Sequence, residues 1–210
     1  MNLNSYLRRA TVIAVALFLI FALVTMLRWN PERFNNGTWD LTKESGNQQK
    51  PVSLSGKWEF YYGQLLDSDD FKTDKTLADK DYIKVPGSWD EHASGYPNQG
   101  VATYRMVIQY PEAIKDPALR ITNVFTAYKL FVNGQLLTSV GTIKGIDSEN
   151  SEGAQVIIVT LPTDTQTAEI IVQVSNQKYA KGGLRASPIF GSKVELDRIE
   201  IAIWPFKCFL

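Results

Sequence analysis

Few side chains in this sequence could do chemistry. His92 is the only histidine and Cys208 the only cysteine among the 210 residues. A serine hydrolase triad would have to use His92, but no G-x-S-x-G elbow is present. One histidine and one cysteine also exclude a multi-histidine metal site, a cysteine zinc cluster and an intrachain disulfide. His92 lies in a polar loop, where we expect it to be exposed, and we predict no catalytic residue, no metal and no cofactor.

Carboxylates are plentiful, but their spacing does not identify a catalytic pair. A glycoside hydrolase needs two carboxyl groups that face each other across a cleft, which a sequence cannot show. The carboxylates include Glu59, Asp69, Asp70, Asp90, Glu91, Asp147, Glu149 and Glu152, and acidic residues in loops are usually only solvated. The Lys181-Gly182-Gly183 stretch lacks the strand–turn–helix context of a phosphate-binding loop.

Aromatic residues in turn-rich segments are more informative. Their flat faces, together with nearby amide and carboxylate groups, suit sugar rings, which offer C–H faces and many hydroxyls. We expect Trp58 and Tyr104 to lie in the core rather than in a site. Because ligands commonly bind to loops at one end of a rigid scaffold, we predict one ligand-binding site formed by Trp89, Asp90, Tyr96, Tyr179 and Arg185.

The elements that would position these loops are short strands. Downstream of Lys57, runs rich in β-branched and aromatic residues alternate with turn residues. The pair Asn133-Gly134 between two apolar runs is a strong hairpin signal, because a type I′ turn needs positive φ at both positions. We expect about eight strands, over residues 57–62, 81–86, 102–111, 118–124, 127–141, 154–162, 168–176 and 187–196. With no long amphipathic helix, this pattern predicts an all-β fold, an antiparallel jelly-roll sandwich.

An apolar segment precedes this region. Residues 10–27 carry no charge and would form a helix about 27 Å long, close to the thickness of the membrane hydrocarbon. Arg8 and Arg9 predict a cytoplasmic N-terminus, and Trp29 fits an aromatic belt on the far side. The alternatives are a cleaved signal peptide, although no A-x-A site follows, and a buried core helix, although no polar face is present.

We therefore expect a single-pass protein of the cell membrane whose domain lies outside the cytoplasm. The predicted parts are a cytoplasmic N-terminus (1–9), a transmembrane signal anchor (10–28), a linker or leading segment (29–52), the jelly-roll domain (53–195) and a truncated linker or tail (196–210). The net charge is zero; with Arg8, Arg9 and Arg28 set aside, 19 basic residues remain against 22 acidic ones. This mildly acidic balance argues against nucleic acid as a partner.

Five short motifs carry a resemblance to a known family. They are Leu54-Ser55-Gly56-Lys57-Trp58-Glu59-Phe60, Val85-Pro86-Gly87-Ser88-Trp89, Thr103-Tyr104-Arg105, Leu130-Phe131-Val132-Asn133-Gly134 and Val172-Gln173-Val174-Ser175-Asn176. Their order and spacing resemble the extracellular jelly-roll region of bacterial seven-transmembrane receptors with diverse intracellular signalling modules. More distantly, they are similar to the sugar-binding jelly roll of family 2 glycoside hydrolases. The resemblance covers roughly residues 39 to 194.

The resemblance implies a galactose-binding-like sandwich that senses a ligand outside the cytoplasm, and the ligand that it implies is a carbohydrate. In the receptors it precedes seven transmembrane helices and a cytoplasmic kinase, cyclase or phosphatase, none of which this sequence contains. We expect residues 196–210 to be a truncated linker in which Pro205 interrupts any helix, or else a final strand. Two alternatives stay open: an accessory sugar-binding domain of a glycoside hydrolase, and a structural or protein-docking module without a small ligand.

Overall fold

The computed structural model describes residues 13–18, 34–35, 37–42, 50–73, 79–122, 127–141, 143 and 156–207. The chain divides into two units, Met1–Arg33 and Phe34–Leu210. In the first unit, residues 13–18 are helical and all six of their side chains are exposed. Among the described residues, no helix is both long and apolar enough to cross a membrane. The rest of the 10–28 segment lies outside the described residues, so the anchor stays a prediction.

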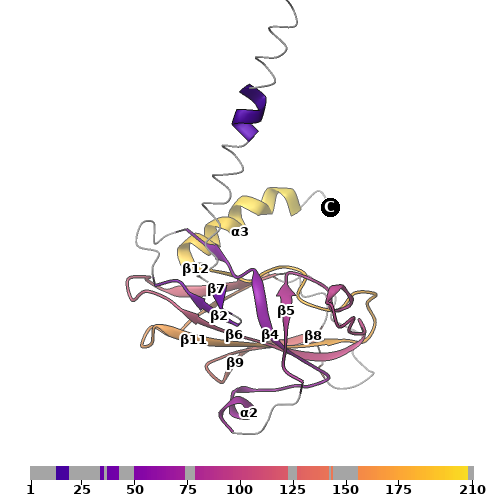
Figure 1. Ribbon diagram of the computed structural model, residues 1–210. Helices are drawn as coiled ribbons and strands as arrows, with labels where there is room; N and C mark the ends of the chain where they lie inside the picture. The colour runs from indigo at the N-terminus through magenta and orange to yellow at the C-terminus, as the bar shows by residue number, and fades with distance from the viewer. Residues whose placement is uncertain are drawn as a thin grey trace, which may run out of the picture. The chain divides into compact units, whose positions relative to one another are not determined.

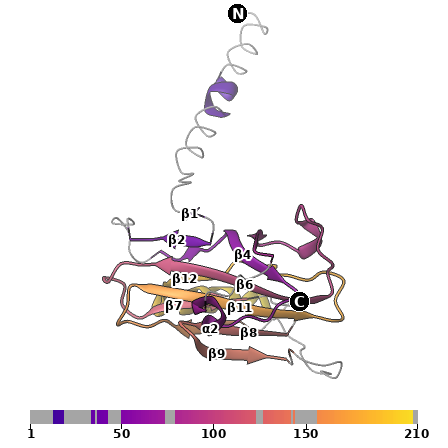
Figure 2. The ribbon, with the colours of Figure 1, turned by 60° about the horizontal axis from the view of Figure 1, so that its bottom comes forward.

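The second unit is a sandwich of two sheets with a helix on each outer side (Figures 1 and 2). The larger sheet has the order β1-β2-β6-β11-β8-β9, and β4 joins the same edge of β6 as β2 while β5 pairs with β4. Its strands are β1 (Phe34–Asn35), β2 (Thr38–Asp40), β4 (Gly56–Tyr62), β5 (Asp81–Val85), β6 (Gly100–Gln109), β8 (Ala127–Val132), β9 (Gln135–Val140) and β11 (Thr167–Asn176). All of its pairings are antiparallel except β2 with β6.

The smaller sheet is antiparallel, with the order β10-β7-β12-β3. Its strands are β3 (Val52–Ser53), β7 (Pro117–Ile121), β10 (Ile157–Thr160) and β12 (Ile189–Ser192). The inner faces of the two sheets enclose a core that includes Trp58, Met106, Val172 and Phe190. Alternate residues of each strand reach this core because side chains point to opposite faces along a strand. The expected β-sandwich is therefore confirmed.

Several strands depart from a simple alternation of buried and exposed positions, β7 and β11 most completely. All five residues of β7 are buried, because α3 (Lys193–Lys207) packs on the outer face of the smaller sheet. Nearly all of β11 is buried as well. Its outer face is covered by the strap, which we define as residues 63–73, containing α2 (Ser68–Lys72). In Figure 1, α2 and α3 lie on opposite sides of the sandwich.

Each expected strand range contains a strand, and the hairpin is confirmed. Asn133 and Gly134 both have positive φ, 47° and 82°, between β8 and β9. Trp58 and Tyr104 are in the core as expected. The observed strand ends differ from the expected ones by a few residues, because a local sequence pattern locates a strand more reliably than it locates the strand's ends.

Two segments differ from the expectation. The described part of residues 29–52 forms strands β1 to β3, and Trp39 and Leu41 are buried, so it belongs to the sandwich. The chain after β12 forms the helix α3 rather than a linker interrupted at Pro205 or a final strand, and Pro205 lies within the helix. Leu196 is buried on the smaller sheet, which anchors the first turns. Pro205 stands in the last turn, where its missing amide costs the helix one hydrogen bond to a residue four positions earlier, and the helix ends two residues later.

Candidate functional site

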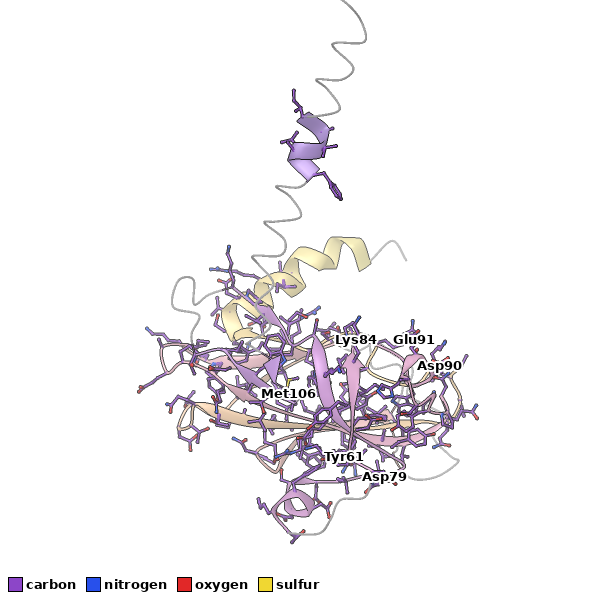
Figure 3. All side chains as sticks on the ribbon, in the orientation of Figure 1. Tyr61, Asp79, Lys84, Asp90, Glu91 and Met106 are labelled. Carbon is purple, nitrogen blue, oxygen red and sulfur yellow. The ribbon has the colours of Figure 1, made fainter. Side chains whose placement is uncertain are left out.

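Two loops meet at the end of the sandwich where β6 begins and β11 ends. We call residues 86–99 and 177–188 together the loop cluster. The first joins β5 to β6 and the second joins β11 to β12. The two loops are brought to the same end because Gly100 of β6 pairs with Asn176 of β11. Figure 3 shows Asp90 and Glu91, both in the first loop, side by side at this end of the domain.

Backbone hydrogen bonds join the two loops. The Trp89 amide donates to the Gly182 carbonyl at 3.0 Å, and the Gly87 amide donates to the Leu184 carbonyl at 3.0 Å. The Gly182 amide donates to Asn98 Oδ1 at 3.1 Å. A Cβ at Gly182 would lie 2.4 Å from the Asn98 carbonyl oxygen and 2.5 Å from the Trp89 ring, so only glycine permits this approach. The loops therefore form one connected surface.

Trp89 supports this surface from beneath. Its side chain is fully buried, and its indole Nε1 donates to the Tyr104 hydroxyl at 2.7 Å. The Tyr62 ring meets it edge-on, with ring centroids 5.6 Å apart. Burial raises the pKa of Tyr104, so this hydroxyl stays neutral. Because Trp89 has no exposed face, it can hold the loops in place but cannot itself touch a ligand.

Asp90 and Lys181 form an ion pair across the two loops. Hydrogen bonds from Lys181, Ser88 and Asn98 lower the pKa of Asp90 to about 2. Asp90 is therefore a carboxylate at neutral pH. Both side chains keep more than a third of their surface exposed, so the pair presents hydrogen-bonding groups of both signs to solvent.

Tyr179 has an exposed ring on an immobilised backbone. The residue as a whole is 42% exposed. Its backbone amide donates to Asn176 Oδ1 at 3.0 Å, and its carbonyl accepts from Asn176 Nδ2 at 2.9 Å. Asn176 is completely buried, and the same Nδ2 donates to the Asn98 carbonyl at 2.7 Å. A buried amide thus fixes Tyr179 in the second loop and ties it to the first.

Tyr96 belongs to an aromatic stack at the edge of the first loop. Its ring stacks on Tyr62, with centroids 5.0 Å apart, and on His92, with centroids 5.6 Å apart. Its hydroxyl donates to Asp81 Oδ2 at 2.8 Å. The expectation that His92 is exposed is wrong. Its side chain is mostly buried, because the ring stacks on Tyr96 and Nε2 lies 3.0 Å from the Tyr82 carbonyl oxygen.

The five predicted site residues are all in the loop cluster, but they are placed differently. Asp90 and Tyr179 are exposed, Tyr96 is partly exposed and Trp89 is buried. Arg185 is exposed and follows Leu184, which pairs with Gly87. The sequence reasoning missed Asn98, Asn176, Lys181 and Gly182, which connect the loops. Among the described residues, no group of three histidine, cysteine or acidic side chains could hold a metal ion.

A second polar cluster lies on the outer face of the larger sheet. Arg105 on β6 donates through Nε to Glu169 at 2.7 Å and through Nη1 to Glu59 at 2.9 Å. Lys80 also donates to Glu59, at 2.9 Å. Burial would raise the pKa of Glu59, but hydrogen bonds from Lys80 and Arg105 outweigh it and hold the pKa below its usual value. Burial and the Glu59 charge raise the pKa of nearby Tyr61 to about 12.

This cluster fastens the strap to the sheet. Ser68 donates to Glu169 at 2.6 Å, and the Phe71 ring lies 4.7 Å from the Arg105 guanidinium. Thr103 and Gln173 donate to backbone carbonyls of the strap, at 2.8 and 3.0 Å. Since these polar groups are all partnered, we interpret the cluster as structural.

Solved structures similar to this domain are glycoside hydrolases. A glycosyl hydrolase family 2 (GH2) member from Bacteroides cellulosilyticus aligns with a TM-score of 0.51 and 16% identity, over 68% of this chain and 20% of that chain. A β-glucuronidase from Ruminococcus gnavus aligns with a TM-score of 0.51 and 15% identity, over 70% and 29% of the two chains. The GH2 β-galacturonidase from Eisenbergiella tayi gives 0.48 and 16%, over 69% and 24%.

The domain shares its fold with part of the GH2 hydrolases. At these identities the likeness concerns the fold alone, and this chain spans less than a third of the length of those enzymes. It supports the distant similarity to the GH2 jelly roll. The resemblance to seven-transmembrane receptors stays a prediction. No protein-family model and no curated protein matches the sequence.

Proposed function

We propose that this protein is a non-catalytic carbohydrate-binding module and that its ligand binds at the loop cluster. The shared fold with part of the GH2 hydrolases supports this proposal and favours an accessory sugar-binding domain. In this proposal Asp90, Tyr96, Tyr179 and Arg185 contact the ligand, and Trp89 supports them from the core.

The observation that carries the proposal is the pairing of a buried asparagine with an exposed tyrosine. Asn176 satisfies both backbone polar groups of Tyr179, and the residue remains 42% exposed. An exposed aromatic side chain on a fixed backbone is pre-organised, so little conformational entropy is lost when a ligand stacks on it. The adjacent Asp90–Lys181 pair offers the acceptors and donors that sugar hydroxyls require.

Tyr179→Ala should abolish most of the carbohydrate binding and leave the fold intact. Removing a ring that becomes buried under a ligand costs about 1.5–3 kcal/mol, which weakens binding by roughly ten- to a hundredfold. The free energy of unfolding should change by no more than about 0.5 kcal/mol, because the ring is exposed in the free protein. Calorimetric titration of the full-length chain with oligosaccharides, beside urea unfolding, measures both quantities.

Leu136→Ala is the matched control for this experiment. Leu136 on β9 is also an exposed, large apolar residue, but it lies outside the loop cluster. This variant should bind like the wild type. If Tyr179→Ala binds every oligosaccharide as tightly as the wild type does, the loop cluster is not the carbohydrate site.

A second candidate function is the ligand-sensing domain of a membrane-anchored bacterial receptor. The observation that favours it is in residues 13–18, where Ile13, Val15, Leu17 and Phe18 are each at least half exposed on a helix. Consecutive apolar residues exposed around a helix are costly in water and suit a lipid surrounding. The two candidates share the binding site and differ in what the binding serves.

The receptor candidate predicts that the domain lies outside the cytoplasm. Protease added to intact cells should digest residues after Trp29, because Arg8 and Arg9 retain the N-terminus inside. Digestion that begins only after the membrane is permeabilised would contradict this orientation. Reading the gene beyond codon 210 separates the two candidates, since a cluster of apolar segments favours the receptor and a catalytic barrel favours the hydrolase.

A further inference from the structure

The two loops of the cluster carry opposite charges. Residues 177–188 contain Lys178, Lys181 and Arg185 and no acidic residue. Residues 86–99 contain Asp90 and Glu91 and no lysine or arginine. Since the chain beyond residue 28 is mildly acidic, with 19 basic against 22 acidic residues, the basic loop stands out against its own domain.

The charges do not cancel within the cluster. Asp90 pairs with Lys181. Glu91 keeps its negative charge, although the Ser88 amide donates to its carboxylate at 3.4 Å in a capping box, so the cluster carries three basic against two acidic residues. Within the described part of the chain, Lys178 and Arg185 have no carboxylate partner. Two exposed cations therefore remain in the loop that presents Tyr179.

We infer that the carbohydrate bound at the loop cluster is anionic, a polysaccharide that carries carboxylate or sulfate groups. This inference rests on the proposed function and specifies its ligand. Tyr179 offers a face for a sugar ring, and Lys178 and Arg185 lie one and six residues from it on the same loop. A guanidinium can bind a carboxylate or sulfate through two parallel hydrogen bonds, which adds geometric selectivity to the charge.

The loop is suited to this task because its backbone is held at three points. Asn176 fixes Tyr179, Asn98 receives the Gly182 amide, and Gly87 donates to Leu184. Lys178 and Arg185 are on either side of this stretch, so the backbone positions that carry the two cations are held. A held backbone loses less free energy to ordering when a ligand binds.

Matched polysaccharide pairs test the inference with the full-length chain. The first pair is polygalacturonate and its methyl ester, and the second is dextran sulfate and dextran; each shares one backbone and differs in charge. In at least one pair, the charged member should bind about tenfold more tightly than its neutral partner at low salt. This difference in affinity should shrink at physiological salt, because counterions screen exposed charges. The double variant Lys178→Gln/Arg185→Gln should bind the charged polysaccharide about tenfold more weakly than the wild type does.

The control variant is Lys50→Gln/Lys115→Gln, which removes two exposed lysines outside the loop cluster. It should bind like the wild type, and a loss equal to that of the loop variant would indicate unspecific attraction and overturn the inference. If the neutral members bind as tightly as the charged ones, the inference fails and the proposed function stands. If no member of either pair binds and neutral oligosaccharides do not bind either, both the inference and the proposed function are contradicted.

Discussion

Arg105→Met should destabilise the domain by about 3 kcal/mol, one of the two largest losses that we expect from a single substitution. Arg105 bridges Glu59 and Glu169, whose side chains are 10% and 19% exposed. Removing the guanidinium leaves two poorly solvated carboxylates, of which Glu59 retains Lys80 and Glu169 retains Ser68. Methionine keeps much of the side-chain volume, so the loss reports the charge. Urea unfolding of the full-length chain measures it.

Lys72→Met is the control for Arg105→Met. Lys72 pairs with Asp69 at the same distance, 2.9 Å, but both side chains are largely exposed. An exposed pair contributes at most about 1 kcal/mol, so this variant should unfold nearly like the wild type. Equal losses in the two variants would contradict the structural role of Arg105.

The same cluster should make the fold sensitive to acid. The folded-state pKa of Glu59 lies below its ordinary value of 4.5, so the stabilisation by this carboxylate is present above that ordinary value. It is lost as the pH falls through the lowered folded-state pKa. Arg105→Met should weaken this acid dependence, because Glu59 then loses one of the two hydrogen bonds that lower its pKa.

Trp89→Ala should lower the free energy of unfolding by about 3–5 kcal/mol. The substitution removes one of the largest fully buried side chains and leaves a cavity beneath both loops. It also removes the donor to Tyr104, whose hydroxyl is itself buried. We therefore expect loss of ligand binding together with loss of stability. Thermal and urea unfolding, compared with binding, separate this variant from Tyr179→Ala.

Tyr104→Phe tests the hydrogen-bonding part of this effect alone. It keeps the ring and leaves the Trp89 Nε1 group without its acceptor, which should cost about 1–3 kcal/mol. If Trp89→Ala is no more destabilising than Tyr179→Ala, then Trp89 does not support the loops in the way that its burial implies.

Much of the sandwich follows from local sequence patterns. Alternation of apolar and polar residues located strands such as β6, because one face of a strand is buried and the other is not. Asn133-Gly134 located the β8–β9 hairpin because few residue pairs adopt positive φ at both positions. The strands β1 to β3 are two or three residues long, too short to show a period, and were not expected.

The helix α3 was not predicted from the sequence, for a different reason. Its sequence mixes charged and apolar residues around Pro205, and its helical preference alone is weak. The smaller sheet provides what the local sequence lacks, because β7 and β12 offer an outer face on which Leu196 is buried. Tertiary packing decided this element.

The candidate site shows the same division between sequence and structure. The types and turn-rich surroundings of Trp89, Asp90, Tyr96, Tyr179 and Arg185 were readable from the sequence, because aromatic and charged residues in loops are candidates for binding wherever the loops lie. Which of them is buried was not readable, since burial depends on segments distant in the chain. Gly182 meets Asn98 across 84 residues and Arg105 meets Glu169 across 64. Only the tertiary structure sets such contacts, because they depend on the pairing of β6 with β11, which brings both loops to one end of the sandwich.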